Sequence, residues 1–127
     1  MIKVTGIDHI VFVAADVERT VAWYADVLGL VPERLEEWRA GSVLFASLRI
    51  TPTSIIDVFA GERTGVNVDH LALVVDPSVD LHALAASGTV EVDHEPFRIW
   101  GAQGYGLGMY LRDPEGNRVE LKQYATG

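Results

Sequence analysis

The sequence predicts an α+β fold made of two βαβββ modules, and three observations support this prediction. A short apolar segment at residues 7–13, IDHIVFV, returns at residues 68–74 as VDHLALV. Each copy carries one histidine near its start, His9 or His70, and is followed by an aspartate and a helix-like stretch. Three more strand-like stretches complete each half. Four strands and one helix are too few to bury both faces of a sheet, so we expect the two modules to combine into a cup-like mixed β-sheet.

The first module covers about residues 5–60. After a strand at 7–14, Asp16 is a suitable N-cap for a helix whose apolar residues recur at helical spacing up to Leu28. Gly29 stands where a helix C-terminus favours a left-handed residue. Three strands are then expected, at 31–38, 42–48 and 54–60.

The second module covers about residues 67–125 and repeats this order after a short joint at 61–65. Its first strand is expected at 68–75, followed by a helix that starts at Asp76-Pro77 and ends at about residue 86. The last two strands are joined by the turn DPEGN, which has proline early and glycine late. The remaining strands are expected at 90–99, 107–112 and 118–124, with the turn at 113–117.

Composition limits the classes of function. The chain of 127 residues is long enough for a single domain, and its 49% hydrophobic and 22% charged residues are typical of a soluble globular protein. Its formal net charge of −8 argues against a nucleic-acid partner and against an anionic membrane surface. No apolar run approaches the roughly 20 residues of a membrane-spanning helix, and the absence of cysteine excludes disulfides and thiolate chemistry. We expect a cytoplasmic homodimer that acts on a small molecule, with its modules either kept within each chain or exchanged between chains.

Histidines and carboxylates at repeated positions predict a metal site. A histidine inside an apolar strand needs a hydrogen-bond partner or a metal ion, because an unpaired buried polar group costs roughly 1–3 kcal/mol. His9 and His70 hold the same place in the repeat, and so do Asp57 and Glu120, each between two apolar residues of a later strand. We therefore expect His9, His70 and Glu120 to bind one divalent ion, with Asp57 as a fourth ligand or a base. Two histidines and one carboxylate suit Fe(II), whereas two and two suit Ni, Zn, Mn or Co.

A glycine-rich segment at 97–108 is a second functional feature. Four glycines in eight residues predict a mobile connection between strands, and Arg98, Trp100 and Tyr105 would close over a substrate there. The alternative is an exposed hairpin without ligand contacts. The two other histidines, His82 and His94, are expected at the surface.

The chain resembles the vicinal oxygen chelate superfamily, which includes glyoxalase I, extradiol dioxygenases and bleomycin-binding resistance proteins. The likeness rests on the duplication, on the Asp-His pair in each first strand and on the ending YLRDPEGNRVEL at 110–121. It implies the glyoxalase/bleomycin resistance/dioxygenase fold over residues 1–127, with His9, His70 and Glu120 as metal ligands. Asp57 matches the fourth ligand position, which is glutamate in glyoxalase I, so aspartate there is a departure.

The resemblance leaves three functions open. The first is a metal-dependent lyase or isomerase of the glyoxalase type, which chelates a small oxygenated substrate and stabilises an enediolate-like intermediate, with Glu120 or Asp57 as base. The second is an Fe(II)-dependent extradiol dioxygenase. Tyr110 matches a substrate-binding tyrosine of that class, but Gly101 stands where those enzymes have an acid–base histidine. The third is a metal-free protein that sequesters a drug-like molecule. We favour the first.

Overall fold

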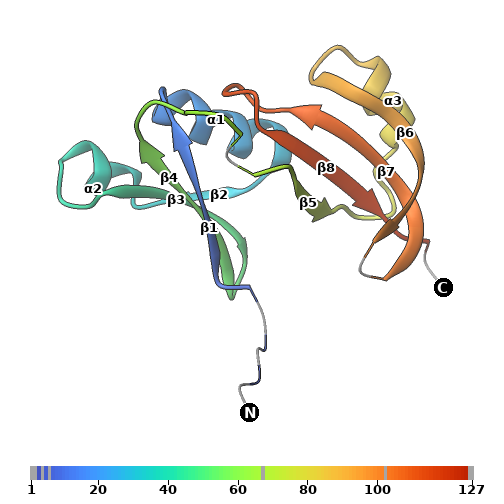
Figure 1. Ribbon diagram of the computed structural model, residues 1–127, viewed down its shortest axis with the longest axis horizontal. Coiled ribbons are helices and arrows are strands. Elements are labelled where there is room, and N and C mark those ends of the chain that lie inside the picture. The colour runs from blue at the N-terminus through green and yellow to red at the C-terminus, as the bar shows by residue number, and fades with distance from the viewer. Residues whose placement is uncertain (1–2, 4, 6, 67, 102, 126–127) are drawn as a thin grey trace. The chain divides into compact units, whose positions relative to one another are not determined.

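The computed structural model describes residues 3, 5, 7–66, 68–101 and 103–125 (Figure 1). It divides into two compact units, Met1–Asn67 and Val68–Gly127. Each unit contains one four-stranded mixed sheet with a helix after its first strand, which confirms the α+β class. How the two sheets combine into a cup stays a prediction. No helix in the described part of the chain is long and apolar enough to cross a membrane.

The first unit has the sheet order β1-β4-β3-β2, in which β1 runs parallel to β4 and the other pairs are antiparallel. Its helix α1 begins after Asp16, whose side chain accepts a hydrogen bond from the Arg19 N–H at 2.9 Å, and ends at Gly29, which has φ +71°. Tyr24 of α1 is fully buried near Phe12 of β1. The elements are β1 (His9–Ala14), α1 (Val17–Leu28), β2 (Val31–Glu33), α2 (Leu35–Arg39), β3 (Phe45–Thr51) and β4 (Ser54–Ala60).

Two predicted strands of this unit need correction. The strand expected at 31–38 ends at Glu33, because Arg34 takes a left-handed conformation with φ +61° and the next five residues form α2. These residues, LEEWR, include good helix formers, and Arg39 also donates to Glu18 of α1 at 2.8 Å. The strand expected at 42–48 lies three residues later, since β3 pairs with β4 up to the turn that joins them.

The second unit repeats this arrangement with the sheet order β5-β8-β7-β6 and a parallel β5–β8 pair. One face of its sheet is lined by buried apolar residues, among them Met109, Leu111 and Leu121. The elements are β5 (Leu71–Val74), α3 (Leu81–Ala86), β6 (Glu91–Gly101), β7 (Gly104–Arg112) and β8 (Arg118–Gln123).

The helix of this unit starts four residues later than expected, so the prediction of a start at Asp76-Pro77 is wrong. Asp80 is the N-cap and accepts from the Ala83 N–H at 3.0 Å. Asp76 instead accepts from the Ser78 N–H at 2.9 Å and so closes a local turn. Gln123 donates to the Asp76 and Val79 carbonyls at 3.0 and 2.7 Å, which holds this segment to the end of β8.

The glycine-rich segment is a strand rather than a connection, which corrects the expected mobile loop. β7 begins at Gly104 and pairs with β6 along the hairpin as far as Gly101. The glycines are required by close packing. A Cβ at Gly106 would lie 2.4 Å from the Gln123 carbonyl oxygen, and a Cβ at Gly108 would lie 2.8 Å from the Ile99 side chain.

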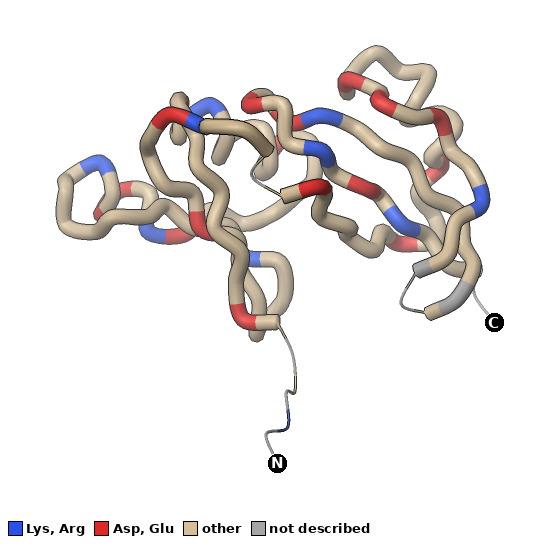
Figure 2. Tube along the Cα trace, in the orientation of Figure 1, with Lys and Arg blue, Asp and Glu red and all other residues tan. Residues whose placement is uncertain are grey.

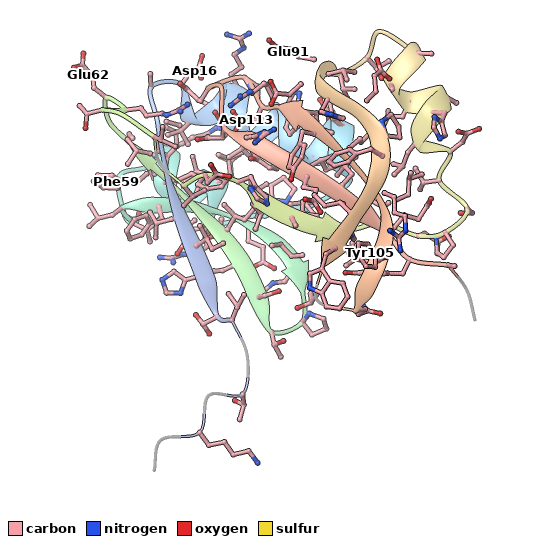
Figure 3. The ribbon with its side chains drawn as sticks, turned by 45° about the vertical axis from the view of Figure 1, so that its right-hand side comes forward. Asp16, Phe59, Glu62, Glu91, Tyr105 and Asp113 are labelled. Carbon is pink, nitrogen blue, oxygen red and sulfur yellow. The ribbon has the colours of Figure 1, made fainter. Side chains whose placement is uncertain are left out.

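The turn at 113–117 forms as predicted and is organised by one buried carboxylate. Asp113, labelled in Figure 3, is 2% exposed. Its side chain accepts from the Glu115 and Asn117 backbone N–H groups at 2.9 and 2.7 Å, and from the Asn117 side-chain amide at 2.8 Å. The turn thereby fixes where β8 starts.

We expect Asp113→Ala to lower the free energy of unfolding by about 2–4 kcal/mol, because it leaves buried N–H donors without their acceptor. Urea denaturation measures the change. The control is Glu62→Ala at an exposed position, which should stay within about 0.5 kcal/mol of the parent. Equal stability of the two variants would contradict a central role for Asp113.

Candidate metal and substrate site

The strand register places histidine and carboxylate in the same relation in both units. In the first, Val11 of β1 pairs with Asp57 of β4. In the second, Ala72 of β5 pairs with Glu120 of β8. Val11 follows His9 by two positions, and Ala72 follows His70 by two positions. Because side chains alternate along a strand, His9 lies on the face of Asp57 and His70 on the face of Glu120.

The structure brings His70 and Glu120 together in the second unit. His70 Nε2 lies 3.7 Å from Glu120 Oε1, and the Glu120 side chain is only 6% exposed. Two ligands of one tetrahedral metal ion, each about 2.0–2.2 Å from it, are roughly 3.3–3.6 Å apart, so a small approach of the two side chains would give them this separation. The spacing therefore fits a shared ion between the imidazole and the carboxylate.

An aspartate next to each histidine determines which ring nitrogen is available to bind a metal ion. His9 Nδ1 lies 2.7 Å from Asp8 Oδ2, and His70 Nδ1 lies 2.6 Å from Asp69 Oδ2. An ionised carboxylate can only accept a hydrogen bond, so Nδ1 carries the proton in both rings and Nε2 keeps its lone pair in the neutral form. This is the usual arrangement of a metal-binding histidine, in which a carboxylate orients the ring from behind.

The first unit holds the two other predicted ligands, His9 and Asp57. Asp57 is buried, and its Oδ1 accepts a hydrogen bond from the Ser47 hydroxyl at 2.6 Å. The hydrogen bond to Asp8 is the largest influence on the pKa of His9 and raises it. Desolvation opposes this rise, and the negative charges of Asp57 and Asp8 add to it with smaller contributions. Within neither unit do the described residues bring three or more metal-binding side chains together.

A hydroxyl group on the neighbouring strand stands opposite each carboxylate. The sequence alone does not reveal this equivalence between the two units, because it depends on the strand register. Ser47 pairs with Asp57 in the first unit, and Tyr110 pairs with Glu120 in the second. Desolvation raises the pKa of Tyr110, and a hydrogen bond to Glu120 raises it further. The phenol therefore stays protonated at neutral pH and donates to the carboxylate.

Tyr110 is surrounded by side chains of its own sheet face. The His70 ring meets it edge-on at 5.3 Å, and the Arg118 guanidinium lies 3.8 Å from its ring centroid. His94, expected only as a surface residue, is its cross-strand partner, at 6.5 Å between ring centroids. His94 is exposed as predicted, but it lies on the face of Glu120. The cross-strand register that shows this depends on bulges in β6, which the sequence does not reveal.

The three other predicted substrate-binding residues, Arg98, Trp100 and Tyr105, form a separate cluster. The Arg98 guanidinium lies 3.6 Å from the Tyr105 ring centroid, and the Trp100 ring meets Tyr105 edge-on at 5.2 Å. Trp100 pairs with Tyr105 near the end of the hairpin (Tyr105 is labelled in Figure 3). The register puts both side chains on the other face of the sheet from Tyr110. Their role in substrate binding stays a prediction.

Comparison with known proteins gives one family. The model of the Glyoxalase/Bleomycin resistance protein/Dioxygenase superfamily matches residues 6–121. Virulence protein STM3117 of Salmonella typhimurium is 26% identical over 121 residues, which are 93% of this chain and 83% of that protein. The crystal structure of a glyoxalase/dioxygenase from Nostoc punctiforme is 26% identical, with a TM-score of 0.70 over 95% of this chain and 92% of that one.

A lactoylglutathione lyase from Agrobacterium tumefaciens shares the fold, with a TM-score of 0.66 and 18% identity over 95% of each chain. The match of the family model covers nearly the whole chain, including both histidines and both carboxylates of the repeat. This chain belongs to the Glyoxalase/Bleomycin resistance protein/Dioxygenase superfamily.

Proposed function

We propose that the protein is a divalent-metal-dependent lyase or isomerase of the glyoxalase type that acts on a small oxygenated substrate. The observation that carries the proposal is the pair formed by His70 Nε2 and Glu120 Oε1, 3.7 Å apart. The pair is supported by Asp69 behind the histidine and by Tyr110 beside the carboxylate. Metal-binding histidines and carboxylates usually have a neighbouring polar group of this kind that orients them.

The ligand set would comprise His9, His70 and Glu120, with Asp57 as a fourth ligand or as a base. Neutral imidazoles and carboxylates suit Zn, Ni, Mn, Co or Fe(II). When bound, such an ion supplies Lewis-acid stabilisation of negative charge on the substrate oxygens.

The chain's own residues have distinct tasks in this proposal. Asp8 and Asp69 fix the histidine rings with Nε2 free. Tyr110 donates to Glu120 and restricts its orientation. Asp57, held by the Ser47 hydroxyl, is the carboxylate that remains available to move a proton between adjacent substrate carbons if it does not bind the metal.

A specific observation favours a second function, an Fe(II)-dependent ring-cleaving dioxygenase. Gly101 occupies the sequence position at which that class has its acid–base histidine, but His94 lies opposite Tyr110 on the face of Glu120. A histidine is therefore present on this face, although from another position.

We expect His70→Ala to abolish stoichiometric binding of a divalent ion, since it removes one of the paired ligands. The protein would be stripped with a chelator, loaded separately with Zn, Ni, Mn and anaerobic Fe(II), and examined by elemental analysis and calorimetry. His82→Ala on α3 is the matched control, because that histidine is exposed, and it should bind metal like the parent. Parent protein without stoichiometric metal would contradict the proposal and favour a metal-free binding protein.

Asp69→Asn should weaken metal binding by about 10–100-fold, because the carboxylate that holds the ring of His70 is lost. Asp8→Asn should act in the same way through His9. Asp26→Asn, at an exposed position of α1, is the control for the same chemical change. Metal dissociation constants from competition with a fluorescent chelator decide the result, and unchanged constants would show that the Asp-His pairs are incidental.

Two assays of the metal-loaded protein separate the two functions. The Ni- or Zn-loaded protein should convert the hemithioacetal of methylglyoxal and glutathione, or a related carbonyl compound, without consuming oxygen. Oxygen uptake by the Fe(II)-loaded protein with catechols, together with a yellow ring-cleavage product and no isomerase activity, would instead establish the dioxygenase.

A further inference from the structure

The first unit contains an open cavity of about 570 Å³ that no step of the proposed function uses. Its lining includes Trp38 of α2, Val43 and Leu44 before β3, and Phe59 near the end of β4, and we refer to it as the Trp38 cavity. Leu44 is 71% exposed and Phe59 is 38% exposed, so a ligand can reach these side chains from solvent. The volume is within the range of small-molecule sites. Large apolar side chains that gather at a surface indicate binding.

The segment that carries Trp38 is not required by the sheet. It lies in residues 34–44, which join β2 to β3. The equivalent strands of the second unit, β6 and β7, instead form a hairpin in which Gly101 pairs with Gly104. None of the residues of α2, all of which the structure describes, is buried. The inserted segment therefore serves something other than the packing of the core.

The start of α2 is strained. The helix follows Arg34, which has φ +61°, a left-handed conformation that is uncommon for any residue except glycine. The Arg34 side chain makes no capping hydrogen bond to the helix. Backbone strain of this kind gathers at binding and catalytic segments, where the surrounding structure maintains it. This supports a functional role for Trp38, the large side chain that α2 adds to the cavity wall.

Arg39 fixes α2 and neutralises the charged part of the cavity wall. Its Nε donates to Glu18 Oε1 of α1 at 2.8 Å, and its guanidinium also donates to Glu36. Glu18 and Arg39 both line the cavity. Figure 2 shows acidic and basic residues following one another through β2 and α2. Because the two charged lining residues pair with each other, a charged ligand would lose hydration without gaining an unpaired counter-charge, and the cavity favours an uncharged ligand.

The walls of the cavity favour an aromatic ring. Phe45 orients the Phe59 ring, with ring centroids 5.4 Å apart (Phe59 is labelled in Figure 3). Trp38, which is half-buried, supplies a second flat side chain. Aromatic side chains bind other rings through large apolar contacts and through edge-on or offset stacking. An aromatic ligand therefore matches these walls better than a flexible aliphatic chain does.

We propose that the Trp38 cavity binds the aromatic ring of an uncharged small molecule. The inference goes beyond the metal-dependent function above, since none of the described residues that line the cavity is a proposed metal ligand. The ring belongs either to the substrate or to a separate compound. Phe59 follows Asp57 by two residues on the same face of β4, about 6.6 Å along the strand. A substrate with an aromatic end and an oxygenated end would therefore contact both residues.

Calorimetry would measure binding of benzamide and of benzoate, which have the same ring and nearly the same size but differ in charge. The test variants are Phe59→Ala and Leu44→Ser, and Phe59→Tyr keeps a ring at the same position. Val66→Ser is the matched control, because Val66 and Leu44 are both 71% exposed and Val66 lies outside the cavity. Circular dichroism and thermal unfolding verify the fold of each variant.

We expect the parent to bind benzamide more tightly than benzoate. Phe59→Ala should weaken benzamide binding by about tenfold, because much of the apolar contact with the ring is lost, and Leu44→Ser by about threefold. Phe59→Tyr and Val66→Ser should stay within about twofold of the parent.

Three results would overturn the proposal. The first is a parent protein that binds no benzamide, or binds benzoate equally well. The second is a Phe59→Ala variant with a lower unfolding temperature but unchanged benzamide affinity, which would show that Phe59 only supports the sheet. The third is a dimer of the parent that Leu44→Ser dissociates in analytical ultracentrifugation while no protein binds benzamide, which would make the cavity an interface between copies.

A second pair of probes identifies the source of the ring. 2-Hydroxyacetophenone and hydroxyacetone carry the same oxygenated group, attached to a phenyl or a methyl group. If metal loading tightens binding of 2-hydroxyacetophenone but not of benzamide, the cavity is supported and the ring belongs to the substrate. Equal binding of 2-hydroxyacetophenone with and without metal supports the cavity as a site for a separate compound. If the protein binds no metal while Phe59→Ala loses benzamide affinity, the metal-enzyme function fails and the Trp38 cavity is supported.

Discussion

The parallel pairing of the first and last strands in each unit is the constraint on which the rest of the structure depends. Among the strands that the structure describes, β1 pairs with β4 alone and β5 with β8 alone. A parallel pair with a fixed register puts one histidine and one carboxylate on the same face at a set distance along the sheet. A slip of one residue in β8 would turn Glu120 to the apolar face, where Val119 and Leu121 are buried.

Alternation along the strands places the apolar core and the polar side chains of the candidate site on opposite faces of a sheet. In the second unit one face carries the apolar core, and the other carries His70, Tyr110, Glu120 and Lys122. Neighbouring side chains, rather than solvent, orient the polar groups of this face. Asp69 orients the His70 ring, and Tyr110 interacts with the Glu120 carboxylate. Polar groups with fixed partners are already oriented before a ligand arrives, which reduces the cost of binding.

The two units have the same strand register but different residues around their carboxylates, Asp57 and Glu120. Asp57 is held by a serine hydroxyl, whereas Glu120 is held by a phenol within an aromatic cluster. Phe45 and Phe59 of the first unit form an aromatic pair, whereas the equivalent positions of the second unit hold Gly108 and Lys122. The repeat therefore supplies equivalent positions for a histidine and a carboxylate in both units, and the residues around them differ between the two copies.

The sequence by itself determined the class of fold, the α1 helix with both caps, β4 and the equivalence of His9 with His70 and of Asp57 with Glu120, because these depend on local periodicity and on an internal repeat. Only the tertiary structure decided that the segment after Arg34 is helical, which of two aspartates caps α3, and that the glycines of β7 belong to a strand. It also decided that His94 and Lys122 share the face of Glu120 while Arg98 does not. These features depend on contacts between strands and on bulges in β6, and such long-range pairings leave no local pattern in the sequence.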